Sequence, residues 1–288
     1  MSAGTRSSMK PLPTILWVTA SLLSSAAPAE KKLAIIKLAF AQTEDGPGLA
    51  ATYQFIAGES VFFSCLVDGY TKSDKNEIFL TYQIQAKDAR GILLQPASND
   101  KIEATLAPED KDWRPKLRDT IVIPPLADSG EYQVLVSVRD ERSRTDVEAR
   151  ATFHVHGREV APSDTLVVRD FRFLRSEDDT KPLQVAAYRP GDSLWARFIM
   201  TGYKQGDGNQ FDIEYGLSVL SADGAVAYTE PHAAAQKDQP FYPQRYQPGV
   251  LNLNFPKDQK LGEYTIVLTV RDNLGGQSFE TRQRFSVE

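Results

Sequence analysis

Cysteine is almost absent from this chain of 288 residues, in which Cys65 is the only one. A single thiol excludes an internal disulfide, so the fold must be stabilised by packing. Histidine is scarce as well, with three residues, which leaves few candidate bases for a nucleophile. Because Cys65 lies on the apolar side of an alternating stretch, we expect a buried and unreactive thiol.

A surplus of positive charge is also lacking. The chain has 33 Lys and Arg against 38 Asp and Glu, a net charge of -5. This balance argues against nucleic acid as a partner, because binding a phosphate backbone requires basic residues in excess. The hydrophobic fraction of 41% is that of a chain with packed cores, which excludes disorder over most of the length.

No apolar run is long enough to cross a bilayer comfortably, including the one near the N-terminus, residues 15–23. That run follows the basic residues Arg6 and Lys10 and precedes the small-residue triplet at 27–29. This order predicts a signal peptide over residues 1–29, cleaved before Glu30.

An uncleaved N-terminal anchor remains the alternative to cleavage. With cleavage, we expect an exported protein, periplasmic or extracellular, and no membrane insertion of the mature chain.

The rest of the chain is an internal duplication. The triplet at 58–60 reappears in similar form at 191–193, and Gly69-Tyr70 reappears as Gly202-Tyr203, both 133 residues later. Farther along, Gly-Glu-Tyr at 130–132 returns at 262–264 with an offset of 132. Because matching motifs keep an offset of 132 or 133 residues along the chain, the sequence predicts two copies of one module. We place module 1 at residues 30–156, a polar linker at 157–165 and module 2 at 166–288.

Each copy is predicted to consist of strands separated by turns. Apolar residues alternate in Val61, Phe63, Cys65 and Val67, and the stretch at 132–138 shows the same period of two. About seven such strands in roughly 120 residues are typical of a β-sandwich. The predicted fold is therefore all-β, with two tandem antiparallel β-sandwich domains after the signal peptide.

The motif Asp128-Ser-Gly-Glu-Tyr132 before an alternating strand resembles the tyrosine corner of immunoglobulin-like sandwiches. Gly262-Glu-Tyr264, followed by Arg-Asp and a Gly-Gly turn, is also similar to the closing strands of bacterial PKD-type or macroglobulin-type modules. The resemblance implies tandem immunoglobulin-like modules whose corner tyrosines bond to the backbone. Val134 stands where such domains carry their second disulfide cysteine and Tyr82 where a core Trp is expected, so a disulfide-free relative fits better.

No catalytic motif is present in the sequence: it has no Gly-x-Ser-x-Gly, no His-Glu-x-x-His and no phosphate-binding glycine loop. We therefore expect no enzyme activity and no cofactor. The favoured hypothesis is a non-enzymatic binding or scaffolding protein whose ligand is a protein or glycan of the cell envelope. The alternative is a metal-dependent hydrolase that uses His154 and His156.

Two kinds of candidate metal site occur. His154 and His156 alternate along a predicted strand, so their imidazoles share a face and could chelate a transition metal, although a solvated strand end fits the same pattern. Loops with Asp74 and Asn76, and with Asp207 and Asn209, have oxygen ligands for calcium, but these residue types are also ordinary turn formers.

The candidate ligand-binding residues are Tyr242, Arg245 and Tyr246. They belong to a loop of copy two that has about four more residues than its counterpart in copy one, counted from the aligned motifs Trp113-x-Pro115 and Phe241-x-Pro243. Exposed aromatic rings beside an Arg could form a platform for a sugar ring or a peptide. The alternative is that the loop packs its rings onto its own sandwich.

Overall fold

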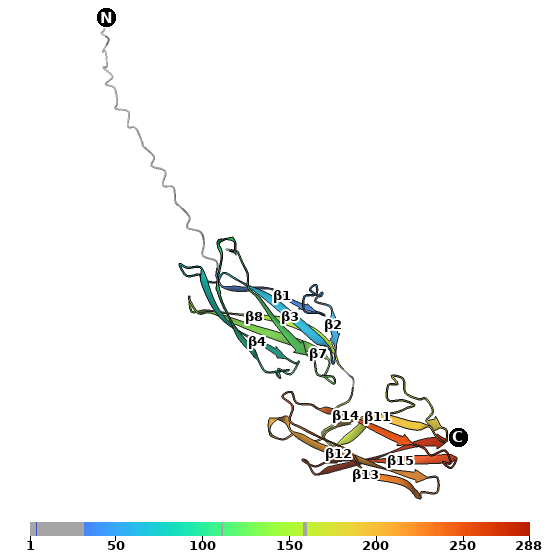
Figure 1. The fold of residues 1–288 in the computed structure, drawn as a ribbon. Helices are drawn as coiled ribbons and strands as arrows, with labels where there is room; N and C mark the ends of the chain where they lie inside the picture. Colours follow the sequence, from blue (N-terminus) through green and yellow to red (C-terminus); the bar gives the residue numbers. More distant parts are fainter. Residues whose placement is uncertain (1–3, 5–31, 111, 158–159) are drawn as a thin grey trace. The chain divides into compact units, whose positions relative to one another are not determined.

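The structure, a computed structural model, describes residue 4 and residues 32–110, 112–157 and 160–288 (Figure 1). The predicted signal peptide and its cleavage site before Glu30 lie outside the described residues, except for Gly4. In the described part of the chain, no helix has both the length and the apolar character that crossing a membrane requires.

The described residues form sixteen strands and two short 3₁₀ helices. In the first copy these are β1 (Ala34–Ala41), β2 (Gln54–Ile56), β3 (Ser60–Asp68), β4 (Glu77–Lys87), β5 (Ser98–Thr105), η1 (Pro108–Asp110), β6 (Lys116–Val122), β7 (Gly130–Asp140) and β8 (Thr145–His156). In the second copy they are β9 (Val167–Leu174), β10 (Ala187–Tyr188), β11 (Ser193–Thr201), η2 (Asp207–Asn209), β12 (Phe211–Ser221), β13 (Val226–Asp238), β14 (Tyr246–Asn254), β15 (Gly262–Asp272) and β16 (Gln277–Val287).

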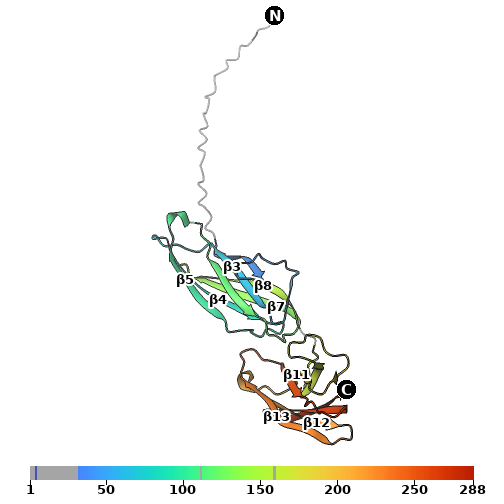
Figure 2. The ribbon, with the colours of Figure 1, turned by 45° about the vertical axis from the view of Figure 1, so that its right-hand side comes forward.

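Each copy is a sandwich of a three-stranded and a five-stranded sheet. The first has the strand orders β1-β3-β6 and β2-β8-β7-β4-β5, and the second has β9-β11-β14 and β10-β16-β15-β12-β13. Figures 1 and 2 show β4, β7 and β8 side by side. Only the short strands β2 and β10 pair in parallel with their neighbours; the other pairs in the described sheets are antiparallel. This division of the chain between two sheets is that of immunoglobulin-like sandwiches, and the predicted all-β class is confirmed.

The repeat seen in the sequence is confirmed in the order and bounds of the strands. β3 and β11 begin 133 residues apart, and β7 and β15 begin 132 residues apart. The short helices are not equivalent, because η1 precedes β6 whereas η2 precedes β12. Both sandwiches belong to one compact unit, Lys32–Glu288. The boundaries at 156 and 166 remain a prediction.

Alternation in the strands places one face of each strand in a core. Val61, Phe63, Cys65 and Val67 of β3 are at most 1% exposed. The residues 133 positions later on β11 are buried to the same extent: Leu194, Ala196, Phe198 and Met200. Each sandwich has its own cluster of buried side chains. Burial raises the pKa of the Cys65 thiol to about 12, which agrees with the expected unreactive cysteine.

Both predicted tyrosine corners are confirmed. The Tyr132 hydroxyl donates to the backbone oxygen of Asp128 at 2.9 Å, and the Tyr264 hydroxyl donates to that of Lys260 at 2.7 Å. Both side chains are buried, at 1% and 6% exposure. A buried phenol needs a partner, and the four-residue return to the backbone supplies one in each copy.

The Arg-Asp pair that follows the corner strand in both copies has one residue at the surface and one in the interior. Arg139 lies at the surface and pairs with Asp146 at 2.9 Å. Asp140, however, is 1% exposed and accepts backbone N–H groups of Thr71 and Arg142 at 2.7 and 2.9 Å. Asp272 repeats this arrangement in the second sandwich. The two aspartates therefore hold loops together from inside the fold.

Residues 30–157 and 164–288, expressed separately, are each expected to unfold cooperatively and to show β-type circular dichroism. The reason is that each sandwich has its own buried core and its own two sheets, which share no strand with the other sandwich. Denaturant titration of both fragments beside the full chain measures this. A fragment that is disordered by itself would show that the proposed domain boundary is wrong.

Candidate functional site

The predicted ligand-binding residues lie on the segment that leads from β13 into β14. Tyr242 and Arg245 precede β14, and Tyr246 is its first residue. Pro240 and Pro243 restrict the backbone here and remove two N–H donors, which favours an extended segment outside the sheet ladder.

Side chains of the second sandwich hold this segment in place. Four of them donate to its backbone carbonyls: Asn209 Nδ2 to Phe241 (2.7 Å), the Tyr203 hydroxyl (2.5 Å) and Gln205 Nε2 to Gln244, and Thr201 Oγ1 to Arg245 (3.0 Å). In the first sandwich, Tyr70 makes the equivalent bond to the carbonyl of Trp113 at 2.5 Å. The tyrosine of the repeated Gly-Tyr pair therefore bonds to this segment in both copies. In the second copy, Asn209 of the turn at 207–209 also bonds to it.

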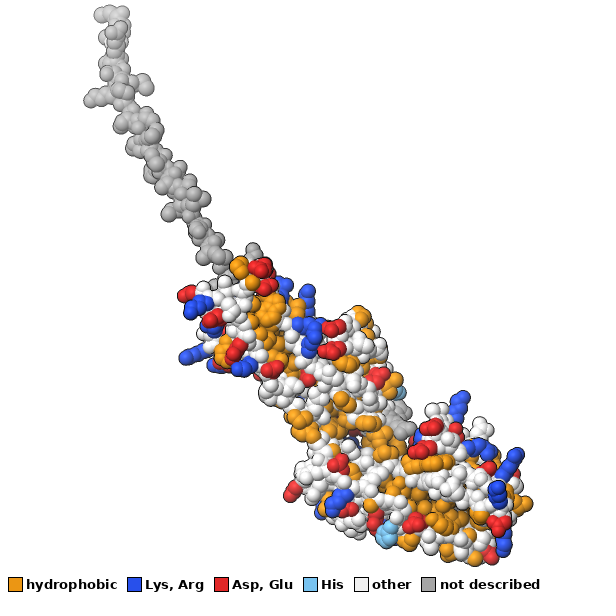
Figure 3. Space-filling view, in the orientation of Figure 1, with side chains coloured by type: hydrophobic (Ala, Val, Ile, Leu, Met, Phe, Trp, Pro, Cys, Tyr) orange, Lys and Arg blue, Asp and Glu red, His pale blue; other side chains and the backbone are white. Residues whose placement is uncertain are grey.

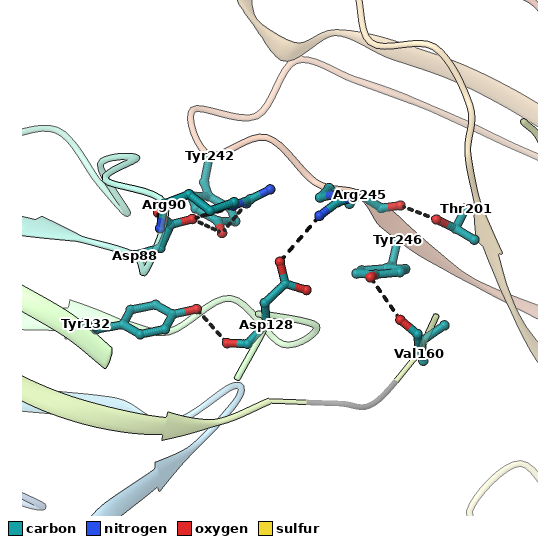
Figure 4. Close-up of polar contacts among 9 residues, drawn as sticks. All are labelled: Asp88, Arg90, Asp128, Tyr132, Val160, Thr201, Tyr242, Arg245 and Tyr246. Carbon is teal, nitrogen blue, oxygen red and sulfur yellow. Dashed lines mark hydrogen bonds and ion pairs between the residues drawn. The ribbon is translucent and has the colours of Figure 1, made fainter. Parts of the chain in front are cut away.

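Tyr242 is bonded to a turn of the first sandwich. Its hydroxyl donates to Asp88 Oδ2 at 2.8 Å and accepts from the Arg90 guanidinium at 3.0 Å (Figure 4). Its ring packs against the core cluster of the first sandwich. Burial and the neighbouring Asp88 carboxylate raise the pKa of Tyr242 above its ordinary value. The Tyr242 ring therefore packs against the first sandwich.

Asp88 is the centre of this contact. It is 2% exposed, and its Oδ1 accepts the backbone N–H groups of Arg90 and Ile92 at 2.9 and 2.8 Å. The Arg90 side chain pairs with Oδ2 at 3.1 Å. The Asp88 carboxylate thus stabilises its own turn through Oδ1, and its Oδ2 also accepts the hydrogen bond from the Tyr242 hydroxyl.

Arg245 and Tyr246 contact the chain near the end of the first sandwich. Arg245 Nη1 lies 3.6 Å from Asp128 Oδ2, and the Tyr246 hydroxyl donates to the backbone oxygen of Val160 at 3.0 Å (Figure 4). Tyr246 is only 5% exposed, so its ring is not part of an exposed aromatic platform and is packed, as in the alternative considered for this loop. The ring is covered because Tyr246 is the first residue of β14 and its hydroxyl bonds to Val160, in the chain that connects the two sandwiches.

A cavity of about 400 Å³ lies among these contacts. Its walls are largely aliphatic and come from both copies: Pro124, Pro125 and Leu126 from the first, Pro243 and Pro248 from the second. Arg90, Asp128, Gln244 and Arg245 supply polar groups to the same lining. A concave apolar space with a few converging polar groups is the usual form of a binding site.

The residues that sequence reasoning missed are Asp88, Arg90 and Asp128. At the offsets of the repeat, their counterparts are Ser221, Asp223 and Lys260. The sequence therefore contains a signal: all three residues are charged in the first copy and are replaced by another type in the second. Comparing the turns of the two copies, and not only the strands and loops, would have identified them.

The predicted metal ligands His154 and His156 lie on β8, where they face away from the buried Phe153 and Val155. They share a face as expected, with His154 half-buried and His156 exposed. Over the described ranges, no three His, Cys, Asp or Glu side chains are grouped closely enough to hold a metal ion. A metal site at these histidines remains a prediction.

The loops considered for calcium contain left-handed turns. Asn76 and Asn209 have φ values of 58° and 65°, a conformation that asparagine adopts more readily than most residues. Asn209 also directs its amide to the segment before β14. These observations favour the interpretation as turn formers.

Charge on the molecular surface is mixed. Figure 3 shows Lys and Arg side chains interspersed with Asp and Glu on the face drawn, without a continuous basic area. This distribution agrees with the net charge of -5.

Comparison with known proteins gives only remote similarities. No family model and no curated protein matches the chain. Among solved structures, the C-terminal domain of the Streptococcus pyogenes antigen I/II-family protein AspA is 10% identical over 90% of this chain and 99% of that one, with a TM-score of 0.29. Fibronectin(III)-like modules of CbhA from Clostridium thermocellum are 14% identical over 89% of this chain and 94% of theirs, with a TM-score of 0.23.

A family 123 glycoside hydrolase from Clostridium perfringens is 15% identical over 43% of this chain, with a TM-score of 0.30. The chain spans 27% of that enzyme's length. With TM-scores this low, none of these similarities supports an argument. The fold assignment therefore rests on the strand order and the two cores.

Proposed function

We propose that the chain is an exported, non-catalytic binding protein whose tandem immunoglobulin-like modules take up a protein or glycan of the cell envelope. The binding site is the cavity beside Tyr242, Arg245 and Tyr246. The observation that carries this proposal is the composition of the walls, which combine aliphatic and polar residues of both copies.

The site is suited to binding more than to catalysis, because Asp88, Arg90 and Tyr242 already have structural partners. The Asp88 carboxylate is buried and takes hydrogen bonds from two backbone N–H groups, Arg90 and Tyr242. The raised pKa of Tyr242 keeps the phenol protonated at neutral pH. No member of this group is held as a free base beside a nucleophile.

The test is capture of envelope components by the mature chain, together with binding to a glycan array. Leu126→Asp places a charge in the aliphatic wall and should abolish capture of a ligand of either class. Leu261→Asp is the matched control, since Leu261 is 67% exposed and outside the cavity lining. Thermal melts of both variants confirm folding.

Equal capture by the two variants would show that the ligand binds elsewhere, and no specific capture by the wild type would overturn the proposal. Zinc that copurifies with the protein and is lost in His154→Ala would favour the alternative hydrolase.

A further inference from the structure

The cavity has unused hydrogen-bond donors. A guanidinium has five N–H donors, yet among the residues that the structure describes the Arg245 guanidinium makes only an ion pair with Asp128, at 3.6 Å, which is longer than a hydrogen bond. Both side chains are partly open to solvent, at 39% and 37% exposure. Arg90, by contrast, is committed to Asp88 and Tyr242. Arg245 is therefore the cation of the cavity lining that can take a new partner.

Gln244 adds a second donor. Its backbone oxygen accepts from Tyr203 and Gln205, and its Oε1 accepts from Gln247 Nε2. The acceptors of this residue are used inside the protein, and its amide N–H groups donate to no other described residue, so they can donate to a ligand. Because Arg245 and Gln244 both offer hydrogen-bond donors, the cavity favours a ligand group with acceptor oxygens, such as a carboxylate.

The walls favour aliphatic side chains over a sugar ring. Stacking against a pyranose needs an open aromatic face, but Tyr246 is 5% exposed and the Tyr242 ring packs against the first core. The cavity lining also includes the aliphatic side chains of Pro125, Leu126 and Pro248. A volume of about 400 Å³ accepts the side chains of a short segment and not a folded domain.

We propose that the cavity binds an extended peptide segment of a partner protein, in which an Asp or Glu pairs with Arg245 and a neighbouring aliphatic side chain lies between Pro125, Leu126 and Pro248. This inference rests on the proposed function and names the partner class. Arg245 supplies specificity for the acidic residue, and the aliphatic wall supplies burial.

The probe is a phage-displayed library of short random peptides, selected on the full mature chain. Enriched peptides are expected to share an acidic residue beside an aliphatic one. For a synthetic peptide of that kind, Arg245→Ala should weaken binding roughly tenfold or more. Arg282→Ala, which removes an exposed arginine paired with Glu280 on β16, should leave the affinity unchanged.

A double-mutant cycle tests the pairing itself. Converting the peptide's acidic residue to its amide should weaken binding to the wild type about as much as Arg245→Ala does, with little further loss when both changes are combined. Additive losses, or enriched peptides without an acidic residue, would overturn the inference.

Failure of the inference is distinguishable from failure of the proposed function. If no peptide is enriched but a glycan is captured and lost in Leu126→Asp, the binding function stands and the peptide class is wrong. If neither peptide nor glycan nor envelope protein is captured, both are wrong.

Discussion

Asp140→Ala is expected to destabilise the first sandwich by about 3 kcal/mol, and Asp272→Ala should do the same to the second. Asp140 accepts backbone N–H groups of Thr71, Arg142 and Ser143, and alanine would leave these donors without their partner. Asp272 holds Lys204, Leu274 and Gly275 in the same way. Urea unfolding of each variant measures the loss.

Asp146→Ala is the matched control for Asp140→Ala. Asp146 pairs with Arg139 at the surface and is 64% exposed, so its removal should cost at most about 1 kcal/mol. Equal midpoints for Asp140→Ala and the wild type would contradict the role assigned to the buried carboxylate.

The Asp140 contribution should also depend on pH. Burial by itself raises the pKa of Asp140, but hydrogen bonds from Thr71 and Arg142 outweigh it and lower the pKa below its ordinary value. A depressed folded-state pKa gives stability that is present above the unfolded-state pKa and is lost as the pH falls through the folded value. The difference between wild type and Asp140→Ala should therefore shrink in acid.

Tyr132→Phe and Tyr264→Phe are each expected to cost roughly 1–3 kcal/mol, by similar amounts in the two sandwiches. Phenylalanine keeps the buried ring and deletes the bond to Asp128 or Lys260. Guanidinium unfolding followed by tryptophan fluorescence and circular dichroism measures both variants.

Tyr228→Phe is the control, since Tyr228 lies on β13 with 47% of its surface exposed, and should change stability by about 0.5 kcal/mol or less. Tyr242 and Tyr246 are unsuitable controls because their hydroxyls bond to Asp88 and Val160. If the corner variants were as stable as Tyr228→Phe, the hydroxyl bonds would not support the fold.

The sequence was sufficient for the class of fold because its signals are local or repeated. Side chains at alternate positions of a strand face the same side, so Val61, Phe63 and Cys65 could be assigned to one core without knowing what covers them. The tyrosine corner joins two residues that are four positions apart and could be predicted from its motif. The repeat then supplied the second sandwich from the first.

The sequence by itself determined the two sandwiches, their buried faces and the segment that carries Tyr242 and Arg245. Tertiary structure decided what that segment meets, since Tyr242 and Asp88 are 154 residues apart and no periodic pattern links them. It also decided that Asp140 is buried, because the loop that supplies its Thr71 donor lies 69 residues away. Alternation and motifs report the neighbours of a residue along its own strand, whereas a buried polar contact depends on groups that only the complete fold brings together.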